Sequence, residues 1–475
     1  MNRSILMLPA LWLGSCSLTL SWDECDASRP CPDGGTCNLG VCEVSTDTDD
    51  PGVTDDTDPP ISTDDVVDVS GIISEDTTWT ADKQWRLTGI VYVDPGVELT
   101  LEPGVRVLGT SGSVLVIERG ARIDARGTSS DPVVFTSAKP AGERAAGDWG
   151  GLVLLGDAVN MAGVDIPFSA VANGSRGEYG GDDDESTCGT LSYVRIEFAG
   201  ISGDGVDEVS ALELAGCGSA TVIDYVQVHA ALDEGVDILG GAVRLRHLLV
   251  TVPGVSGVEW AEGWHGNAQF VAVHLGNIGE LGFEADESML TPVQQPESRP
   301  EMFNMTLLAS GDAAGQVAIE FSQGTRAHMH NMIIAGHSYL GIEVKDEETA
   351  ANLDAFLIEV AYSLFFDIGD GGEYWFPTSA DETAIEAFDG RDDDGGFDED
   401  DFFRNRMEDN VFGVDPEIEQ LDNVALCGWV PQATLPNVGI PPHEGQGFVP
   451  GTRFLGAFDP GATPWHEGWT TNTPD

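Results

Sequence analysis

Three stretches of the sequence, "VYVDPGVEL" (91–99), "LTLEPGVRV" (99–107) and "LVIERGARI" (115–123), align without gaps. They share the pattern apolar-x-apolar-acidic-x-Gly-x-x-apolar, and their offsets of 8 and 16 residues make about three units per turn of 24. Alternation with a period of two, closed by a Pro-Gly or Arg-Gly corner, is typical of very short strands separated by bends. A self-similar chain with a period in the twenties predicts a solenoid, and short strands favour the parallel β-helix among solenoids.

The second half of the chain repeats one strand in longer coils, a coil being one turn of the solenoid. The spacing widens near 286–304 and 345–410, where we expect projecting loops. We therefore predict an all-β fold, a right-handed parallel β-helix over residues 71–470. The recurring strand is "YVRIEFAG" (193–200), "YVQVHAA" (225–231), "HLLVTVPG" (247–254), "FVAVHLGN" (270–277), "MTLLASGD" (305–312) and "MIIAGHS" (332–338).

The strand that follows each of these repeats carries a carboxylate between apolar neighbours. Because adjacent side chains on a strand point to opposite faces, the apolar neighbours should face the interior and the carboxylate should face outward. Coils about 4.8 Å apart would set these carboxylates in one column. The residues are Glu213 in "ALELAG", Asp237 in "DEGVDILGG", Glu259 in "GVEWAEG", Glu284 in "GFEADES", Glu320 in "AIEFSQG" and Glu343 in "GIEVKDE".

A column of like charges needs compensation, since two charges at that spacing repel by about 3–4 kcal/mol at an effective dielectric of 20. A hard, oxygen-rich column suits Ca²⁺, so we predict the six carboxylates as calcium ligands. The alternative is a solvated acidic face that keeps the stack from associating sideways. Arg195, Arg244 and Arg246 lie on neighbouring strands and could supply part of the compensation.

The composition excludes one class of partner. The chain has 81 Asp+Glu against 21 Lys+Arg, a formal net charge of −60. Phosphates require basic neutralisation, so we expect no nucleic acid as a partner. Such a surface attracts cations instead. A hydrophobic fraction of 41% is that of a globular protein.

The N-terminus reads as an export signal. "MNRSILMLPALWLGSC" has a basic residue, Arg3, followed by an apolar run at 5–13 and small residues. A run of this length behind a short basic start is typical of a signal peptide, here 1–15. The residues before Cys16 resemble the bacterial lipobox, which implies lipidation of Cys16. Ser17 in the next position implies the outer membrane; the alternative is an ordinary signal peptide with an incidental cysteine.

A small cysteine-rich module should follow at 16–44. In an exported protein, four cysteines within 18 residues predict two disulfides, with three possible connectivities. The module resembles those behind the lipobox in myxobacterial surface lipoproteins. Residues 45–70 are rich in Asp, Thr and Pro, and we expect a disordered acidic linker. The module cysteines are Cys25, Cys31, Cys37 and Cys42.

Three cysteines lie in the body. Cys188 and Cys217 each precede a recurring strand, so a disulfide across coils is the first expectation. Cys427 is then unpaired, although it could instead take one of those partners.

Longer stretches of the body resemble a family of secreted bacterial right-handed β-helix proteins. They are "AGDWGGLVLLGDA" (146–158), "LSYVRIEFAG" (191–200), "GSATVIDYVQVHAALDEGVDILGGAVRLRHLLVT" (218–251) and "EGWHGNAQFVAVHL" (262–275). "RFLGAFDPGATPWHEGWT" (453–470) resembles the closing signature of the family. The resemblance implies architecture and location more than a reaction.

Catalysis is the competing interpretation. Many right-handed β-helices cleave acidic polysaccharides with carboxylate-held Ca²⁺ and a basic residue, but the sequence lacks a compact set of galacturonase motifs. Trp260 and Trp264 could stack on sugars, although they suit a core equally well. We therefore expect a lipid-anchored, surface-exposed outer-membrane protein with a structural, adhesive or ligand-binding role. Its partners would be cations, extracellular polysaccharide or cell-surface matrix. The alternative is a Ca²⁺-dependent polysaccharide lyase or another glycan-active enzyme.

Overall fold

The computed structural model describes two units of the chain, 1–61 and 62–475. In the first unit it describes β1 (Thr36–Asn38) and β2 (Val41–Glu43), an antiparallel pair that sets Cys37 opposite Cys42. Cys16, Cys25 and Cys31 lie outside the described residues, so lipidation and the module disulfides stay predictions. In the second unit the described residues are 65–202, 208–287, 295–310, 315–369, 372, 376–377, 394–423, 427–443 and 447–472.

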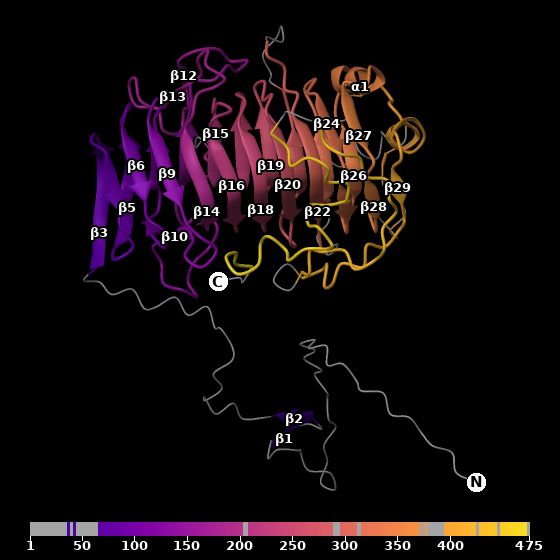
Figure 1. Cartoon of the computed structure of the whole chain (residues 1–475), viewed down its shortest axis with the longest axis horizontal. Helices are drawn as coiled ribbons and strands as arrows, with labels where there is room; N and C mark the ends of the chain where they lie inside the picture. The colour runs from indigo at the N-terminus through magenta and orange to yellow at the C-terminus, as the bar shows by residue number, and fades with distance from the viewer. Residues whose placement is uncertain are drawn as a thin grey trace. The chain divides into compact units, whose positions relative to one another are not determined.

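The second unit is an all-β parallel β-helix, which confirms the predicted fold class. Figure 1 shows its strands side by side, from β3 in indigo to β29 in orange. Each coil contributes to three parallel faces, and every inter-coil pairing in the stack is parallel. The first coil begins at Val66, within the stretch assigned above to the linker.

The ladder face is the one that carries the predicted carboxylates. Its inward residues are aliphatic and stack coil on coil, as Leu212 does on Val236 and Val236 on Val258, all at most 1% exposed. Its strands are the second halves of β3 (Val66–Ile73) and β5 (Gln84–Val93), then β8 (Val114–Ile117), β11 (Gly151–Leu155), β15 (Leu212–Ala215), β17 (Val236–Leu239), β19 (Ser256–Ala261), β21 (Leu281–Ala285), β23 (Val317–Phe321) and β26 (Leu340–Val344).

The tail face is named for the C-terminal segment that covers part of it. Its strands are the first halves of β3 and β5, then β7 (Arg106–Gly109), β10 (Val133–Ser137), the second halves of β14 (Gly189–Glu197), β16 (Val222–His229), β18 (Arg244–Thr251), β20 (Asn267–His274) and β22 (Glu301–Leu308), and finally β25 (Ile333–Ala335), β28 (Leu364–Phe366) and β29 (Val411–Phe412).

The third face closes the coil between the other two. It contains β4 (Thr77–Trp79), β6 (Glu98–Leu101), β9 (Arg122–Arg126), the first halves of β14, β16, β18, β20 and β22, then β24 (Ala327–His330) and β27 (Ile358–Ala361).

Of the predicted loop at 345–410, residues 378–393 lie outside the described residues, and most of the rest departs from a loop. The described part contains α1 (Glu347–Asp354), two further solenoid strands (β27 and β28), α3 (Glu399–Asp401) and the π-helical turn η4 (Phe402–Arg406). The prediction was wrong here because β27 and β28 are three or four residues long, too short to show a clear alternation. Within the described part of the chain, none of the helices is long and apolar enough to cross a membrane.

The corner between the third face and the tail face is a column of left-handed residues. Tyr193, Tyr225, His247 and Phe270 have φ between 48° and 61°. A side chain at positive φ costs about 1–2 kcal/mol, so the turn needs compensation. The rings supply it by stacking, with centroids 4.5 Å apart for Tyr193 and Tyr225 and 4.3 Å for Tyr225 and His247.

The tail, residues 413–472, runs back along the tail face (Figure 1, yellow). The Thr471 amide donates to Gln227 Oε1 at 2.8 Å, and the Ala457 amide donates to Thr306 Oγ1 at 2.8 Å. Trp429 and Phe458 of the tail are fully buried in an apolar cluster with outward residues of this face. The tail therefore shields this side of the stack from water.

In the described β-helix a disulfide joins Cys188, directly before β14, to Cys217, after β15, with a Cα–Cα distance of 5.8 Å. It is the pair that the sequence suggested first. Cys427 is a free cysteine, buried in the tail cluster.

Candidate functional site

The six predicted carboxylates stand in a single column on the ladder face, the carboxylate file. Strand register pairs each of them directly with the next, one per coil. The column also extends in the other direction, through Val153, Val116 and Tyr92, which are apolar or aromatic. The predicted stacking is therefore confirmed, and the acids are the later part of a longer outward column.

The alternative of a solvated acidic face is wrong. Glu213 is 1% exposed and Glu343 is 3% exposed, and the four carboxylates between them are partly buried. The cover at the first coils is the insertion, residues 157–187 between β11 and β14, which includes the hairpin of β12 (Ile166–Pro167) and β13 (Glu178–Tyr179).

Tyr179 is the residue of the insertion that packs on the ladder face beside the carboxylate file. Its ring packs in the apolar cluster on the ladder face, and its hydroxyl donates to Glu262 Oε2 at 2.7 Å. Burial raises the pKa of Tyr179, and the nearby carboxylates Glu262, Glu213 and Asp237 raise it further. The phenol therefore stays a hydrogen-bond donor beside the file.

Glu213 and Asp237 form a carboxyl pair, directly opposite one another on β15 and β17. Burial raises the pKa of each well above its ordinary value. Their mutual interaction adds to the rise at Asp237 and opposes it at Glu213. The raised pKa values favour protonation within the pair, which relieves the repulsion between the two carboxylates.

The next part of the file gathers into a carboxylate trio of Glu234, Glu259 and Glu284. One carboxylate oxygen from each lies within 4.8 Å of the other two. Ser210 Oγ donates to Glu234 Oε2 at 3.0 Å, and Ser256 Oγ donates to Glu284 Oε2. These hydroxyls hold two of the three carboxylates in place.

The trio holds protons at neutral pH. Burial raises the pKa of Glu234 to about 8 and that of Glu284 to about 7. Burial and the neighbouring charges of Asp237 and Glu284 raise the pKa of Glu259 well above its ordinary value. All three carboxyl groups have raised pKa values, so a positive charge placed among them would stabilise their ionised forms.

Glu234 was missed by the sequence argument. It precedes β17 in "DEGVDILGG" and does not occupy the alternating position of the file. Its carboxylate enters the site from the turn, which strand alternation does not describe. The only local signal was the acidic pair before the glycine, and that pattern is common in turns.

The last two file members are compensated by a lysine. Lys345 Nζ lies 3.3 Å from Glu320 Oε2 and 3.3 Å from Glu343 Oε1. Arg195 and Arg246 do not supply the expected compensation, because each pairs with an acid outside the file. Arg246 pairs with Asp224 at 2.7 Å and Arg195 with Glu197 at 2.9 Å.

A divalent cation fits the trio. Ca²⁺ binds oxygens at about 2.3–2.6 Å, so ligands across the ion lie about 5 Å apart or less. The mutual oxygen separations of the trio fall in that range. Carboxylate ligands without His or Cys favour a hard cation over zinc. Of the six predicted ligands, the structure brings Glu259 and Glu284 into this arrangement and leaves Glu213, Asp237, Glu320 and Glu343 in pairs of their own.

The aromatic candidates belong to the core. Trp260 and Trp264 are both 0% exposed, with ring centroids 5.8 Å apart. Trp264 Nε1 donates to the Val243 carbonyl at 3.1 Å. A role in sugar stacking is therefore wrong for these two residues.

Comparison with known proteins yields one match. A sequence model of the pectate-lyase-like β-helix domain matches residues 71–393. Neither the curated proteins nor the solved structures yielded a match to the chain. The family match covers more than half of the 475 residues and coincides with the stacked coils that carry the file. The chain therefore belongs to the family of the pectate-lyase-like β-helix domain.

Proposed function

We propose that this protein is a surface-anchored structural protein whose β-helix binds calcium at the trio of Glu234, Glu259 and Glu284. The convergence of one carboxylate oxygen from each of three partly buried glutamates, all within 4.8 Å of one another, carries the proposal. The repulsion among the neighbouring acids is reduced in other ways, by the raised pKa values of Glu213 and Asp237 and by Lys345 beside Glu320 and Glu343. Among the described residues, serine hydroxyls donate to Glu234 and Glu284 and the charge of Lys345 acts on Glu284, and a cation would supply the remaining compensation.

The expected effect of the ion is mechanical. Glu234 precedes β17, Glu259 lies in β19 and Glu284 lies in β21, so one ion would connect three successive coils. Binding to the folded state alone stabilises it by RT ln(1 + [L]/Kd), about 2.7 kcal/mol at 100 times Kd. Calcium would therefore stiffen the middle of the stack.

The location follows from the N-terminal signals. Lipidation at Cys16 would anchor the protein in the outer membrane, and the acidic stretch at 45–70 would lift the β-helix from the membrane surface. A net charge of −60 would concentrate cations around it. Cell-surface matrix and extracellular polysaccharide are the proposed surroundings, with a structural or adhesive role.

The second candidate is a calcium-dependent polysaccharide lyase, and the family match favours it. Such a reaction needs a base beside the cation. Lys345 is the lysine that contacts the file, but its two carboxylate partners favour the protonated ammonium. A new absorbance of unsaturated ends on incubation with uronate polymers and calcium would establish the lyase.

The calcium proposal is tested by thermal unfolding of the full chain carrying Cys16→Ser. We expect millimolar calcium to raise the Tm relative to a chelator, and we expect Glu259→Gln to abolish that increase. The matched control is Glu98→Gln, an exposed glutamate on β6 of the third face. An equal calcium effect on the wild type and on Glu259→Gln would overturn the assignment of the site.

A further inference from the structure

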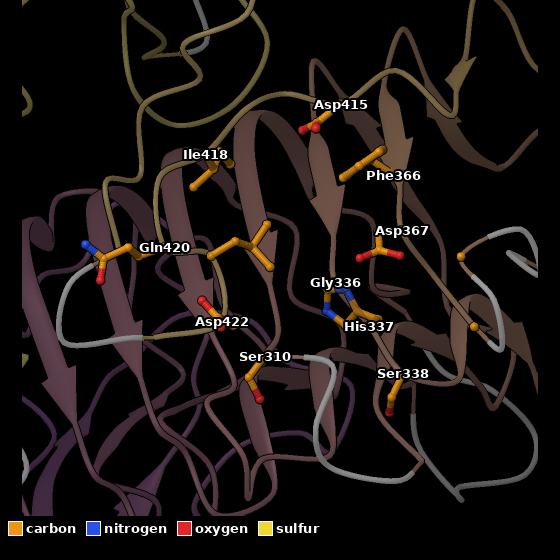
Figure 2. A pocket seen from close by; sticks show the side chains of 13 residues that line it. Ser310, Gly336, His337, Ser338, Phe366, Asp367, Asp415, Ile418, Gln420 and Asp422 are labelled. Atoms are coloured by element: carbon orange, nitrogen blue, oxygen red, sulfur yellow. The ribbon is translucent and has the colours of Figure 1, made fainter. Parts of the chain in front are cut away.

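A second candidate site lies between the solenoid and its own tail. A cavity of about 680 Å³ opens where the turns after β22, β25 and β28 meet residues 415–422 of the tail (Figure 2). None of the trio or file carboxylates lines it. Pockets of roughly 300–1,000 Å³ are typical of small-molecule sites.

His337 is the residue that marks this cavity as more than a packing gap. It lines the cavity, is 1% exposed, and neither of its ring nitrogens has a hydrogen-bond partner among the residues that the structure describes. Leaving a buried donor or acceptor unmet costs about 1–3 kcal/mol. Figure 2 shows the imidazole at the cavity wall, with Ser310, Ser338, Asp367 and Asp422 around it.

The imidazole is neutral over the physiological pH range. Burial, together with the neighbouring His274, lowers the pKa of His337 to about 3. The Ala335 carbonyl opposes this shift, although neither ring nitrogen meets a partner in hydrogen-bonding geometry. A neutral imidazole offers one donor and one acceptor, and a single hydroxyl group can match both.

The other polar side chains that line the cavity mostly present hydrogen-bond acceptor oxygens. Asp367, Asp415 and Asp422 are exposed carboxylates on the cavity wall. Ser310 already donates its proton to the Gly276 carbonyl at 2.7 Å, so its oxygen presents lone pairs. A complementary ligand must therefore bring several donors, which means hydroxyl or amine groups.

The charge of the lining excludes an anionic ligand. A carboxylate placed 4 Å from one aspartate is repelled by about 1 kcal/mol in water and about 4 kcal/mol at an effective dielectric of 20. Three aspartates multiply that penalty. The apolar side chains of Phe366, Ile418 and Leu421 line the same cavity and suit the C–H face of a ring.

We propose that this cavity binds a neutral or amino sugar residue of an extracellular glycan, with His337, Asp367 and Asp422 as hydrogen-bonding residues. Uronates are rejected by the three aspartates. Because the tail supplies Asp415, Ile418 and Asp422, the site exists only when the tail is docked on the solenoid. This inference does not depend on calcium binding at the trio.

The test is a glycan array probed with the full chain carrying Cys16→Ser, in the presence of a chelator so that the trio plays no part. The array includes glucose, galactose, glucosamine, N-acetylglucosamine and galacturonate oligomers. The strongest sugar is then titrated by calorimetry. We expect a neutral or amino sugar to bind and galacturonate oligomers not to bind.

Variants separate the cavity from the rest of the surface. His337→Phe keeps an aromatic ring in place but removes both nitrogens, and Asp422→Asn removes an exposed charge without disturbing the core. We expect each to weaken sugar binding at least tenfold, while Glu98→Gln leaves it unchanged. Preference for uronates, binding of polyamines without any sugar, full affinity in Asp422→Asn, or no glycan binding by the wild type would overturn the proposal.

Discussion

Glu213 and Asp237 face one another from adjacent coils, paired in register between β15 and β17, and burial raises the pKa of both. Two acids at this spacing can coexist away from water only if one is neutral or a positive charge lies beside them. The same opposition of acids recurs along the file, and the repulsion is reduced in different ways. The pKa values of Glu213 and Asp237 are raised, Glu259 and Glu284 converge with Glu234 in the trio, and Lys345 contacts Glu320 and Glu343. A single repeated backbone position therefore carries three kinds of electrostatic compensation.

The stability of the β-helix should depend on pH through the trio. The pKa of Glu284 is raised to about 7 and that of Glu234 to about 8, above the ordinary value of 4.5. The folded state therefore holds protons that the unfolded chain has released, and its stability from these groups is complete below about pH 4.5. It is lost as pH rises through about 7 and 8. In a chelator, Tm should fall between about pH 5 and pH 9.

Calcium and a double variant provide the control for this pH dependence. Saturating calcium replaces the protons and should flatten the decline above pH 7. Glu234→Gln combined with Glu284→Gln should flatten it without calcium. Circular dichroism melts across this pH range give the result, and a decline of equal size in the double variant would contradict the assignment.

Lys345→Met should be strongly destabilising. The lysine side chain is 12% exposed and lies 3.3 Å from both Glu320 and Glu343. Removing one partner of a buried ion pair costs about 3–5 kcal/mol because a buried charge is left uncompensated. The loss should be smaller at pH 5, where a proton can replace the lysine. Urea unfolding measures it, and Lys83→Met, at an exposed lysine, should have almost no effect.

The Cys188–Cys217 disulfide should stabilise the stack. It closes a loop with a sequence separation of 29 residues. Loops of this size contribute about 3–4 kcal/mol in the chain-entropy account. The double variant Cys188→Ala and Cys217→Ala should lose stability of that order in urea. Cys427→Ala, at the free buried cysteine, is the matched control and should lose less; equal losses would contradict the prediction.

Trp469 should be needed to dock the end of the tail. It is 2% exposed and makes edge contacts with Tyr193 and Tyr225, at centroid distances of 5.6 and 6.4 Å. Trp469→Ala should cost about 3–5 kcal/mol by the loss of a buried aromatic side chain. Phe356→Ala, at a phenylalanine that is 45% exposed, is the control. Hydrogen exchange should show faster exchange in the tail of the tryptophan variant alone.

The local sequence determined the repeating part of this protein. The alternation in "VYVDPGVEL" and its relatives indicated short strands, and the period of about 24 indicated coils that stack. Stacking alone then placed Glu213, Asp237, Glu259 and Glu284 in one column, because identical positions of successive coils must pair in register. The same reasoning brought Cys188 close to Cys217.

The tertiary structure decided what lies outside the coils. Alternation tells which side chains leave the core, but it carries no information on which distant segment covers them. The insertion at 157–187 buries the first acids of the file, Glu234 joins the trio from a turn, and the tail builds the cavity around His337. These contacts connect segments without a repeat or a period of their own, so only the folded chain brings them together.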